Sequence, residues 1–331
     1  MVRSLAVSGC AAVIVAIGLA SPAGAAALNR AFVSGHGVDA AGCGPPASPC
    51  RTFQYVHDNI VAANGEIDVL DAAGYGLLTI TKAISIVNDG AGTAGIQAPN
   101  EGQTAITINA GSYDSVSLRG LTLDGMTGSG HGIIVNSAGF LSIANCVVRN
   151  FWGSAPGGGI FVVPSVGTLV LTITDTVVAD NVNGGIMILP YGSANLNGMI
   201  KRSTITGNFG FGVLVSSRGV FGKGPTTGNV DVTIVDTAAT RNNGLANFMV
   251  ESNVGPTSAW MFLDHVSATD GTTGVAAANG GVARLTKSTI TRNNTGVYFA
   301  GGTVESFQDN AIIGNFADFG QFGAMTPVGL K

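Results

Sequence analysis

Charged and aromatic residues are scarce in this chain. Only 10% of its 331 residues are charged, and 15 Lys and Arg against 19 acidic residues give a formal charge of −4. Such a chain lacks the basic surface that nucleic-acid binding requires. It has 50 glycines but only 11 prolines and no Gly-X-Y period, which excludes a collagen-like fibre. A hydrophobic fraction of 46% is enough for a folded core.

Long apolar runs are also missing beyond the first residues, so no membrane span is expected. At the N-terminus, Arg3 precedes an apolar run from Ala11 to Ala20, and Ala23-Gly24-Ala25 follows as a small-x-small sequence. This order predicts a signal peptide over residues 1–25. The mature chain is then expected to begin near Ala26 and to be secreted, in a periplasmic or extracellular location.

Cysteine is rare, with four in all. Export would place the three that follow the signal peptide in an oxidising compartment. Cys43 and Cys50 bracket a short loop kinked by prolines, which predicts a disulfide between them. Cys146 is alone in an apolar pattern and is expected to be a buried small hydrophobe. Three cysteines at these spacings do not predict a zinc site, and no metal is expected.

The rest of the chain is a repeat. A nine-residue phrase has apolar first and sixth positions and often ends in Asn, and its copies lie 22 to 34 residues apart. This spacing is in the range of solenoids. The copies begin at Leu118, Ile143, Ile173, Ile200, Ile234, Leu263, Leu285 and Phe307.

A second phrase, Gly followed by an alternating apolar trio, comes after most copies, as in Gly185-Ile186-Met187-Ile188. Two short strands per repeat cannot bury their inward residues alone, but stacked in parallel they share one continuous core. The recurring Asn suits a left-handed corner and can hydrogen-bond along a ladder of its equivalents. The repeat therefore predicts an all-β, single-stranded parallel β-helix of roughly ten coils.

The N-terminal part carries a more specific likeness. Arg30 to Gly35 leads into the Cys43–Cys50 loop, Thr52 to Ala63 has the pattern of a helix, and a strand and Gly74-Tyr75-Gly76 follow. In this order the chain resembles the bacterial secreted right-handed parallel β-helix repeat proteins of the pectate-lyase-like superfamily. The resemblance implies an N-terminal capping helix. The expected organisation is a cap over 26–64, a β-helix over 65–315 and a C-terminal cap or tail over 316–331, closed by Phe316, Phe319 and Phe322.

The catalytic sets of that superfamily are not evident. Gly35-His36-Gly37 and Gly130-His131-Gly132 resemble the Gly-His-Gly of polygalacturonases, but the chain has neither their Asn-Thr-Asp nor any Asp-Asp. Hydrolysis of a glycosidic bond requires paired carboxylates. A pectate-lyase mechanism would need clustered acids holding Ca²⁺, and the acids here are dispersed. Both histidines are interpreted as turn residues.

Stacking of the phrases predicts one row of charges that alternate in sign. The third positions include Asp175, Arg202 and Asp236, and equivalent positions stack at ~4.8 Å per coil. The row is interpreted as a solvated charge ladder; a saccharide-binding face, or catalysis by these three residues, is the alternative. A second row follows from the eighth positions, which are Asp180, Gly207, Arg241, Asp270 and Arg292.

Two aromatic residues are candidates for sugar contacts. Trp152 falls in an insertion, and Tyr191 comes from the next coil's loop. The alternative is that both rings cover the core.

The sequence thus predicts a secreted, non-enzymatic β-helix module that binds a polysaccharide or cell-envelope component along one face, without a cofactor. The alternative is a polysaccharide lyase or glycoside hydrolase acting on an acidic polysaccharide, with Ca²⁺ only if it is a lyase.

Overall fold

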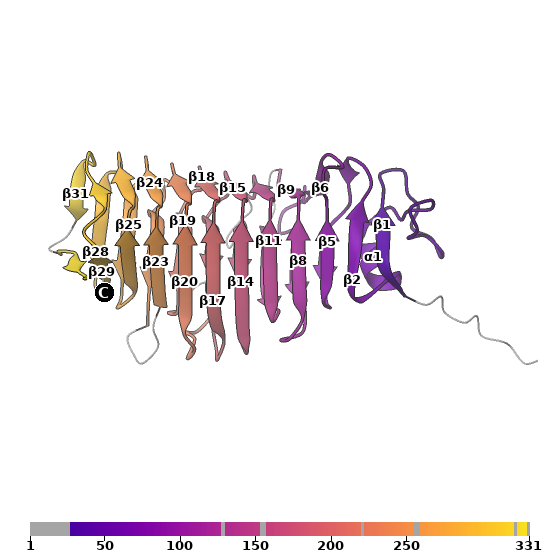
Figure 1. Ribbon diagram of the computed structural model, residues 1–331, viewed down its shortest axis with the longest axis horizontal. Coiled ribbons are helices and arrows are strands. Elements are labelled where there is room, and N and C mark those ends of the chain that lie inside the picture. The colour runs from indigo at the N-terminus through magenta and orange to yellow at the C-terminus, as the bar shows by residue number, and fades with distance from the viewer. Residues whose placement is uncertain are drawn as a thin grey trace, which may run out of the picture.

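The computed structural model describes residues 27–126, 130–152, 157–219, 222–253, 259–320 and 323–329. The predicted signal peptide lies outside these residues. Figure 1 shows an elongated solenoid in which the strands lie side by side from the N-terminal to the C-terminal end. Among the described residues, the named strands of successive coils pair in parallel, as the repeat predicts, and most pairs keep an unbroken register. The register shifts once in the β1–β2 pair and once in the β7–β10 pair.

Three parallel sheets form the walls of the solenoid, and we call them sheets A, B and C. Sheet A has twelve strands in the order β1 (Leu28–Val33), β2 (Val61–Val69), β5 (Ile84–Val87), β8 (Ser115–Arg119), β11 (Phe140–Ala144), β14 (Thr168–Thr174), β17 (Asn195–Lys201), β20 (Val230–Val235), β23 (Ala259–Asp264), β26 (Val282–Thr286), β29 (Thr303–Ser306) and β32 (Thr326–Pro327).

Sheets B and C have ten strands each. Sheet B contains β3 (Ala73–Gly74), β6 (Ala94–Gln97), β9 (Leu121–Asp124), β12 (Val147–Arg149), β15 (Val177–Ala179), β18 (Thr204–Thr206), β21 (Ala238–Thr240), β24 (Ser267–Thr269), β27 (Thr289–Thr291) and β30 (Ala311–Ile312). Sheet C contains β4 (Leu78–Ile80), β7 (Ile106–Asn109), β10 (His131–Ser137), β13 (Gly158–Val162), β16 (Gly184–Ile188), β19 (Phe211–Ser216), β22 (Ala246–Glu251), β25 (Thr273–Ala278), β28 (Thr295–Ala300) and β31 (Ala317–Gly320).

Each coil therefore has three strands, and the expectation of two was wrong. The nine-residue phrase spans the end of a sheet A strand, a corner and a three-residue strand of sheet B. That short strand has one inward residue, such as Val178, so no alternating pattern marks it in the sequence. The fold is the right-handed parallel β-helix that the sequence predicts.

The predicted stacking of the phrases holds for seven of the eight copies, because Ile143, Ile173 and Ile200 pair in register along sheet A. The last copy is displaced by one residue. Leu285 pairs with Ser306 rather than Phe307, whereas Ile290 pairs with Ile312 as predicted. The final corner between sheets A and B thus holds one additional residue.

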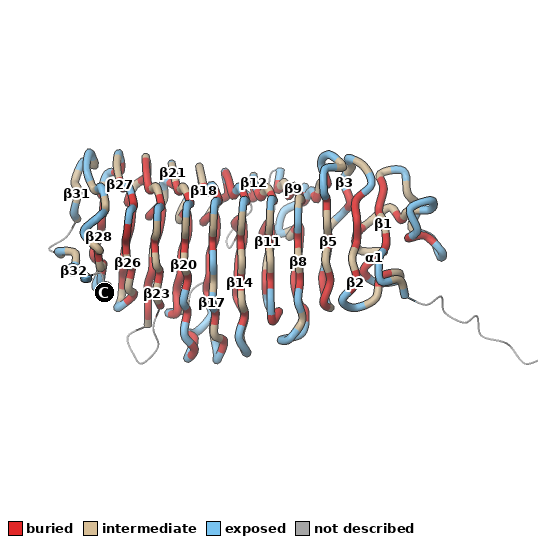
Figure 2. The backbone as a smooth tube through the Cα atoms, in the orientation of Figure 1, coloured by how far each residue is buried: buried red, intermediate tan, exposed pale blue. Residues whose placement is uncertain are grey.

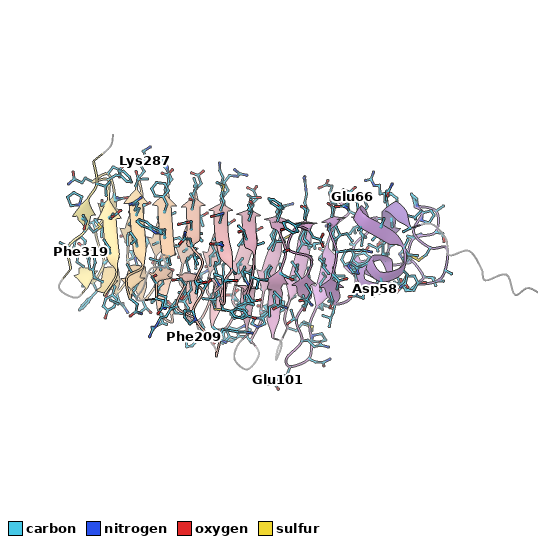
Figure 3. All side chains as sticks on the ribbon, turned by 90° about the horizontal axis from the view of Figure 1, so that it is seen from below. Asp58, Glu66, Glu101, Phe209, Lys287 and Phe319 are labelled. Carbon is cyan, nitrogen blue, oxygen red and sulfur yellow. A yellow bond between two sulfur atoms is a disulfide. The ribbon has the colours of Figure 1, made fainter. Side chains whose placement is uncertain are left out.

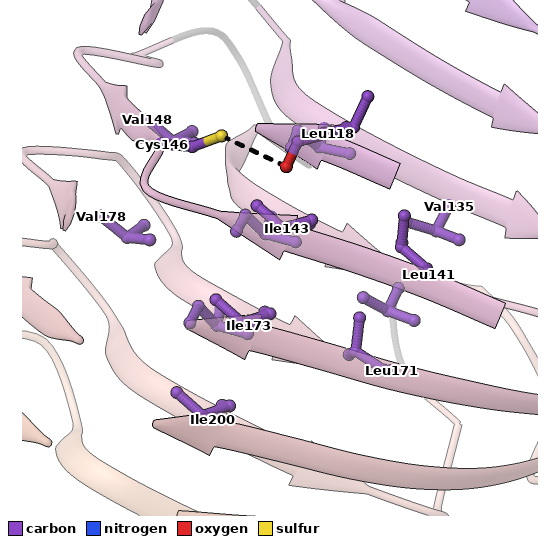
Figure 4. Packing of buried hydrophobic residues seen from close by; sticks show 14 of the residues in the cluster. Leu118, Val135, Leu141, Ile143, Cys146, Val148, Leu171, Ile173, Val178 and Ile200 are labelled. Carbon is purple, nitrogen blue, oxygen red and sulfur yellow. Dashed lines mark hydrogen bonds between the residues drawn. The ribbon is translucent and has the colours of Figure 1, made fainter. Parts of the chain in front are cut away.

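The interior is a column of aligned aliphatic side chains. Inward residues of successive coils, such as Leu118, Ile143, Ile173 and Ile200, stack on one another and are fully buried (Figure 4). Figure 2 shows the resulting alternation of buried and exposed positions along the sheet A strands. Cys146 is buried as predicted, although it lies in the corner between β11 and β12 rather than within a strand.

Two corners flank sheet B in each coil, and each corner has one residue in the left-handed conformation. At the corner between sheets A and B these are the third positions of the phrase, including Asp175 (φ 50°), Arg202 (φ 47°) and Asp236 (φ 50°). At the corner between sheets B and C they are the eighth positions, such as Asp180 (φ 54°) and Arg241 (φ 54°).

The recurring Asn of the ninth position is not left-handed, so that part of the expectation was wrong. Its predicted hydrogen-bonded ladder is present. The side-chain amides of successive coils bond to one another inside the corner, with Asn247 taking the place left by Gly271. The ladder runs through Asn181, Asn208, Asn242, Asn247, Asn293 and Asn315.

The helix α1 (Phe53–Asn59) lies at the N-terminal end beside β1 and β2 (Figure 1). Thr52 is its N-cap, and the hydroxyl oxygen of Thr52 accepts a hydrogen bond from the Tyr55 N–H. The predicted helix extended to Ala63, but the chain turns at Ile60 and enters β2 at Val61. Sheet A pairing takes Val61 as a partner of Leu28, which ends the helix earlier than the apolar spacing suggested.

The predicted disulfide is present, with the Cα atoms of Cys43 and Cys50 separated by 5.1 Å. At the C-terminal end the three phenylalanines of the expected apolar seal differ in their environments. Phe316 is 95% exposed and does not cover the core. Phe319 lies in β31 in register with the buried Val297, and 48% of it is exposed at this last strand of sheet C. Phe322 lies outside the described residues. Met325 also packs against the core.

Candidate functional site

The outer face of sheet A carries a shallow groove over its C-terminal half. Four neighbouring strands, β20, β23, β26 and β29, present outward side chains there, since alternate residues of each strand point away from the core. The groove and its wall are lined by Asp231, Thr233, Trp260, Phe262, Arg284 and Phe307.

The aromatic residues come from one strand. In β23, Trp260 and Phe262 alternate with the buried Met261 and Leu263, so both rings face outward. The register places Asp231 beside Trp260 and Thr233 beside Phe262. A second aromatic contact closes one side, because the Phe262 and Phe307 rings meet edge to face with centroids 6.3 Å apart.

The polar groups of the groove are held in place by one another. The Arg284 guanidinium lies 4.5 Å from the centre of the Trp260 ring, a cation–π contact. The same guanidinium donates to the Glu305 carboxylate on the next strand. Arg284 is thereby fixed between an indole and a carboxylate. Partial burial raises the pKa of Asp231, which lies on the opposite side of Trp260.

A row of outward residues extends from this groove toward the N-terminal end of sheet A, and all but the exposed Met199 carry a hydroxyl group. Strand pairing aligns one outward residue of each coil with the next. From the N-terminal end this row reads Ser85, Ser117, Ser142, Thr172, Met199 and Thr233, and it then meets Phe262. Neighbouring side chains in it are ~4.8 Å apart.

Sequence reasoning missed this groove. The signal was present in Ala259 to Asp264, where two aromatic residues alternate with apolar ones. An alternating pattern in a strand places both rings on one face. The pattern alone does not tell which face of the strand points inward. It also does not tell that Arg284 and Phe307 stand beside the rings, because that depends on the register across three coils.

The predicted row of charges exists as a stack at the corner between sheets A and B. The Arg202 guanidinium forms a bidentate ion pair with the Asp175 carboxylate, with both contacts at 2.8 Å. This pairing lowers the pKa of Asp175. Asp236 follows on the next coil, and all three side chains are exposed to solvent. A general acid in glycoside hydrolysis needs a raised pKa, which is the opposite of what this pair provides.

Trp152 and Tyr191 lie on different parts of the solenoid. Trp152 is half exposed at the corner between sheets B and C, where it lines a groove with Asp180, Phe209 and Arg241. Tyr191 packs against a second apolar cluster on the outer face of sheet C, and the Lys223 ammonium lies 4.6 Å from its ring centre. The structure does not bring the two rings together.

The two Gly-His-Gly histidines also have separate environments. His36 is exposed in the N-terminal loop. His131 is the first residue of β10 and is buried, with its ring stacked on Phe161 at 4.6 Å. Its Nδ1 has no hydrogen-bond partner in the described part of the chain, and burial lowers its pKa to about 4. In the described part of the chain the His131 ring is therefore packed inside the fold and is not presented on the surface.

Among the residues that the structure describes, no group of three His, Cys, Asp or Glu side chains is placed to hold a metal ion. No helix in the described segments is long and apolar enough to cross a membrane.

The three parallel sheets and their register give the protein the right-handed parallel β-helix fold. Three solved structures are similar in fold. Pectate lyase Pel9A is 12% identical, with a TM-score of 0.49 over 91% of this chain and 78% of that one. The mannuronan C-5 epimerase AlgE4 A-module of Azotobacter vinelandii is 15% identical, with a TM-score of 0.46 over 81% and 91%.

The third is the GH136 lacto-N-biosidase from Eubacterium ramulus, 12% identical, with a TM-score of 0.42 over 85% of this chain and 67% of that one. No protein-family model and no curated protein sequence matches the chain. At these identities the similarity concerns the fold alone.

Proposed function

We propose that this protein is a polysaccharide-binding module that holds a glycan along the outer face of sheet A, centred on Trp260 and Phe262. The observation that carries the proposal is the pair of outward aromatic rings on β23 beside Asp231, Arg284 and Glu305. Flat aromatic surfaces combined with a few fixed polar groups are typical of ligand sites, and the polar groups supply orientation and specificity.

The shape of the face supports a chain-like ligand. Beyond Thr233 and the exposed Met199, the outer face of sheet A carries a row of hydroxyl groups from Thr172 to Ser85, and hydroxyl groups both donate and accept hydrogen bonds. Because these hydroxyl groups recur once per coil, they offer equivalent contacts to successive sugar units of a chain. A compact ligand would use only the groove itself.

The carboxylates of the groove favour binding over hydrolysis. Asp231 and Glu305 stand on strands three coils apart and are offset by two residues along the strands, which corresponds to ~16 Å between their backbones. Paired carboxylates in glycosidases are roughly 5–9.5 Å apart. Glu305 is also occupied by Arg284. Asp231 is therefore suited to orienting a sugar, and Glu305 to holding Arg284 in place.

We also infer that the protein works outside the cytoplasm. The inference rests on the N-terminal sequence pattern and on the Cys43–Cys50 disulfide, since disulfides persist in oxidising compartments.

The test is binding of the mature protein to a panel of immobilised neutral and acidic polysaccharides, followed by the same panel with Trp260→Ala. We expect at least a tenfold loss of affinity in the variant. Phe316→Ala is the matched control, because Phe316 is an exposed aromatic between β30 and β31, away from the outer face of sheet A and outside the groove. Undiminished binding by Trp260→Ala would rule out the groove.

Mass spectrometry of the supernatants distinguishes binding from catalysis. A binding module releases no oligosaccharides. Unsaturated products would instead establish a lyase, and saturated products a hydrolase.

A further inference from the structure

A second groove lies at the corner between sheets B and C, away from sheet A. It is lined by Trp152, Asp180, Phe209, Arg241 and Asn243, with Gly207 at its floor. Phe209 projects from this corner, on the edge of the solenoid opposite Lys287 (Figure 3). Trp152 is 50% exposed and Phe209 is 59% exposed, so both rings present a large area to solvent.

Gly207 creates the hollow. It occupies the left-handed corner position between Asp180 on the preceding coil and Arg241 on the following one. With no side chain at Gly207, the Asp180 carboxylate folds over it, and a Cβ there would lie 2.3 Å from Asp180 Oδ1. The row of corner side chains therefore has a gap at Gly207, which the Asp180 carboxylate covers, and Arg241 stands on the coil beyond it.

The same row shows what happens without such a gap. Asp270 and Arg292 occupy this corner position on two adjacent coils, and they form a bidentate pair at 2.7 and 2.8 Å. Neither Asp180 nor Arg241 forms an ion pair within the segments that the structure describes. The Arg241 guanidinium donates to the Thr206 hydroxyl, at 3.3 Å. Both charged groups of the groove thus keep hydrogen-bonding capacity for a ligand.

The two aromatic rings are spaced along the solenoid axis by the asparagine ladder. The Phe151 N–H donates to Asn181, and the Asn181 N–H donates to Asn208. Trp152 and Phe209 directly follow the first and last of these three residues, so they occupy one row two coils apart. Two coils correspond to ~9.6 Å, close to the length of two linked hexose rings.

We propose that this groove is a second saccharide-binding site, which takes a neutral glycan segment with one sugar on Trp152 and another toward Phe209. The lining supplies two hydrophobic ring faces, one carboxylate, one guanidinium and the Asn243 amide. The groove has one negative and one positive side chain, so its net charge is zero. This lining favours an uncharged ligand with many hydroxyl groups over a negatively charged uronate or a positively charged amino sugar. The site does not depend on the sheet A groove.

The chain contains only two tryptophans, one in each groove, which makes the two sites separately observable. In Trp260→Phe the remaining indole fluorescence reports the corner groove, and in Trp152→Phe it reports the sheet A groove. Each variant is titrated with cellohexaose, mannohexaose, laminarihexaose and a hexagalacturonate. We expect at least one neutral hexasaccharide to shift Trp152 emission saturably, and hexagalacturonate to leave it unchanged.

Two further variants establish that the response comes from the groove. In the Trp260→Phe background, Phe209→Ala and Gly207→Val should each weaken the Trp152 response at least fivefold. Tyr113→Ala is the control, because Tyr113 is 92% exposed and lies outside the groove. Circular dichroism checks that the Gly207 variant folds, and Phe209→Ala keeps the test valid if it does not.

The outcomes separate this proposal from the proposed function. If sugars shift only Trp260 emission, the corner site is wrong and the sheet A site stands. If they shift only Trp152 emission, the sheet A site is wrong and the corner site stands. A Trp152 response that survives both groove substitutions, or that hexagalacturonate alone produces, would overturn the proposal for a neutral glycan.

Discussion

Asn181 and Asn208 lie fully buried one coil apart, and the Asn181 side-chain amide donates a hydrogen bond of 2.9 Å to the Asn208 amide oxygen. Asn208 also accepts the Asn181 backbone N–H and donates to Asn242 and to the Val178 carbonyl. One side chain therefore satisfies buried groups on two neighbouring coils. Because an unmade buried hydrogen bond is costly, this corner contributes strongly to the stability of the solenoid.

Replacing Asn208 by Ala should lower the free energy of unfolding by roughly 2–4 kcal/mol, since several buried polar groups lose their partners together. The midpoint of urea unfolding measures the change. The matched control is Asn294→Ala, an exposed asparagine, which should change stability by less than ~0.5 kcal/mol. Equal effects of the two substitutions would show that the ladder contributes little.

The left-handed corner residues lead to a second prediction. Asp236 has φ 50° and an exposed side chain. Asp236→Gly should leave the melting temperature nearly unchanged, since glycine adopts this conformation freely. Asp236→Val should destabilise the protein by ~1–2 kcal/mol, because a β-branched side chain clashes there. Both variants remove the same charge. If the two variants have the same melting temperature, the backbone conformation is not what constrains this position.

The third prediction concerns pH and His131. Burial lowers its folded-state pKa from 6.5 to about 4, so the unfolded chain takes up a proton at a higher pH than the folded one. Stability should be unaffected by this group above pH 6.5 and fall as the pH drops from 6.5 toward 4. The loss attributable to His131 is up to about 3 kcal/mol by proton linkage.

His131→Phe keeps an aromatic ring against Phe161 and removes the titrating group. Urea unfolding between pH 4 and pH 7.5 should therefore show a shallower pH dependence for this variant than for the parent chain. Parallel curves would mean that His131 does not titrate differently in the two states.

The fourth prediction concerns the Cys43–Cys50 disulfide. The bridge closes a loop with a sequence separation of 7, and in the chain-entropy model a loop of this size stabilises by roughly 2 kcal/mol. Cys43→Ser with Cys50→Ser should lower the urea midpoint accordingly. Reductant should reproduce this loss in the parent chain and have no effect on the double variant. A reductant effect of similar size in both proteins would point to another cause.

Much of the architecture could be predicted from the sequence because it is repetitive. The recurrence of Ile143, Ile173 and Ile200 predicted both the stacking of coils and their register, which the strand pairing confirms. The short strands of sheet B were missed because a three-residue strand with one inward side chain, such as Val177–Ala179, has no period to detect. The additional residue before Ala311 was missed for a similar reason, since only the pairing of both flanking strands reveals it.

The candidate sites were less predictable. The sequence indicated Asp175, Arg202 and Asp236 as a stacked row, and the structure stacks them, with Asp175 and Arg202 joined as an exposed ion pair. It also indicated Trp152, but the neighbours of Trp152 in the groove come from coils one, two and three turns away. Trp260 escaped attention because its partners Asp231 and Arg284 are 29 and 24 residues distant in the sequence.

The sequence by itself determined the solenoid, its parallel strands, the buried asparagine ladder and the disulfide. Each depends on side chains that recur at equivalent positions or lie a few residues apart. Only the tertiary structure decided which side chains of different coils stand together on the outer surface. The physical reason is that outward positions are free of the packing constraint that makes the core periodic. Their grouping at Trp260 and at Trp152 therefore leaves no repeat in the sequence.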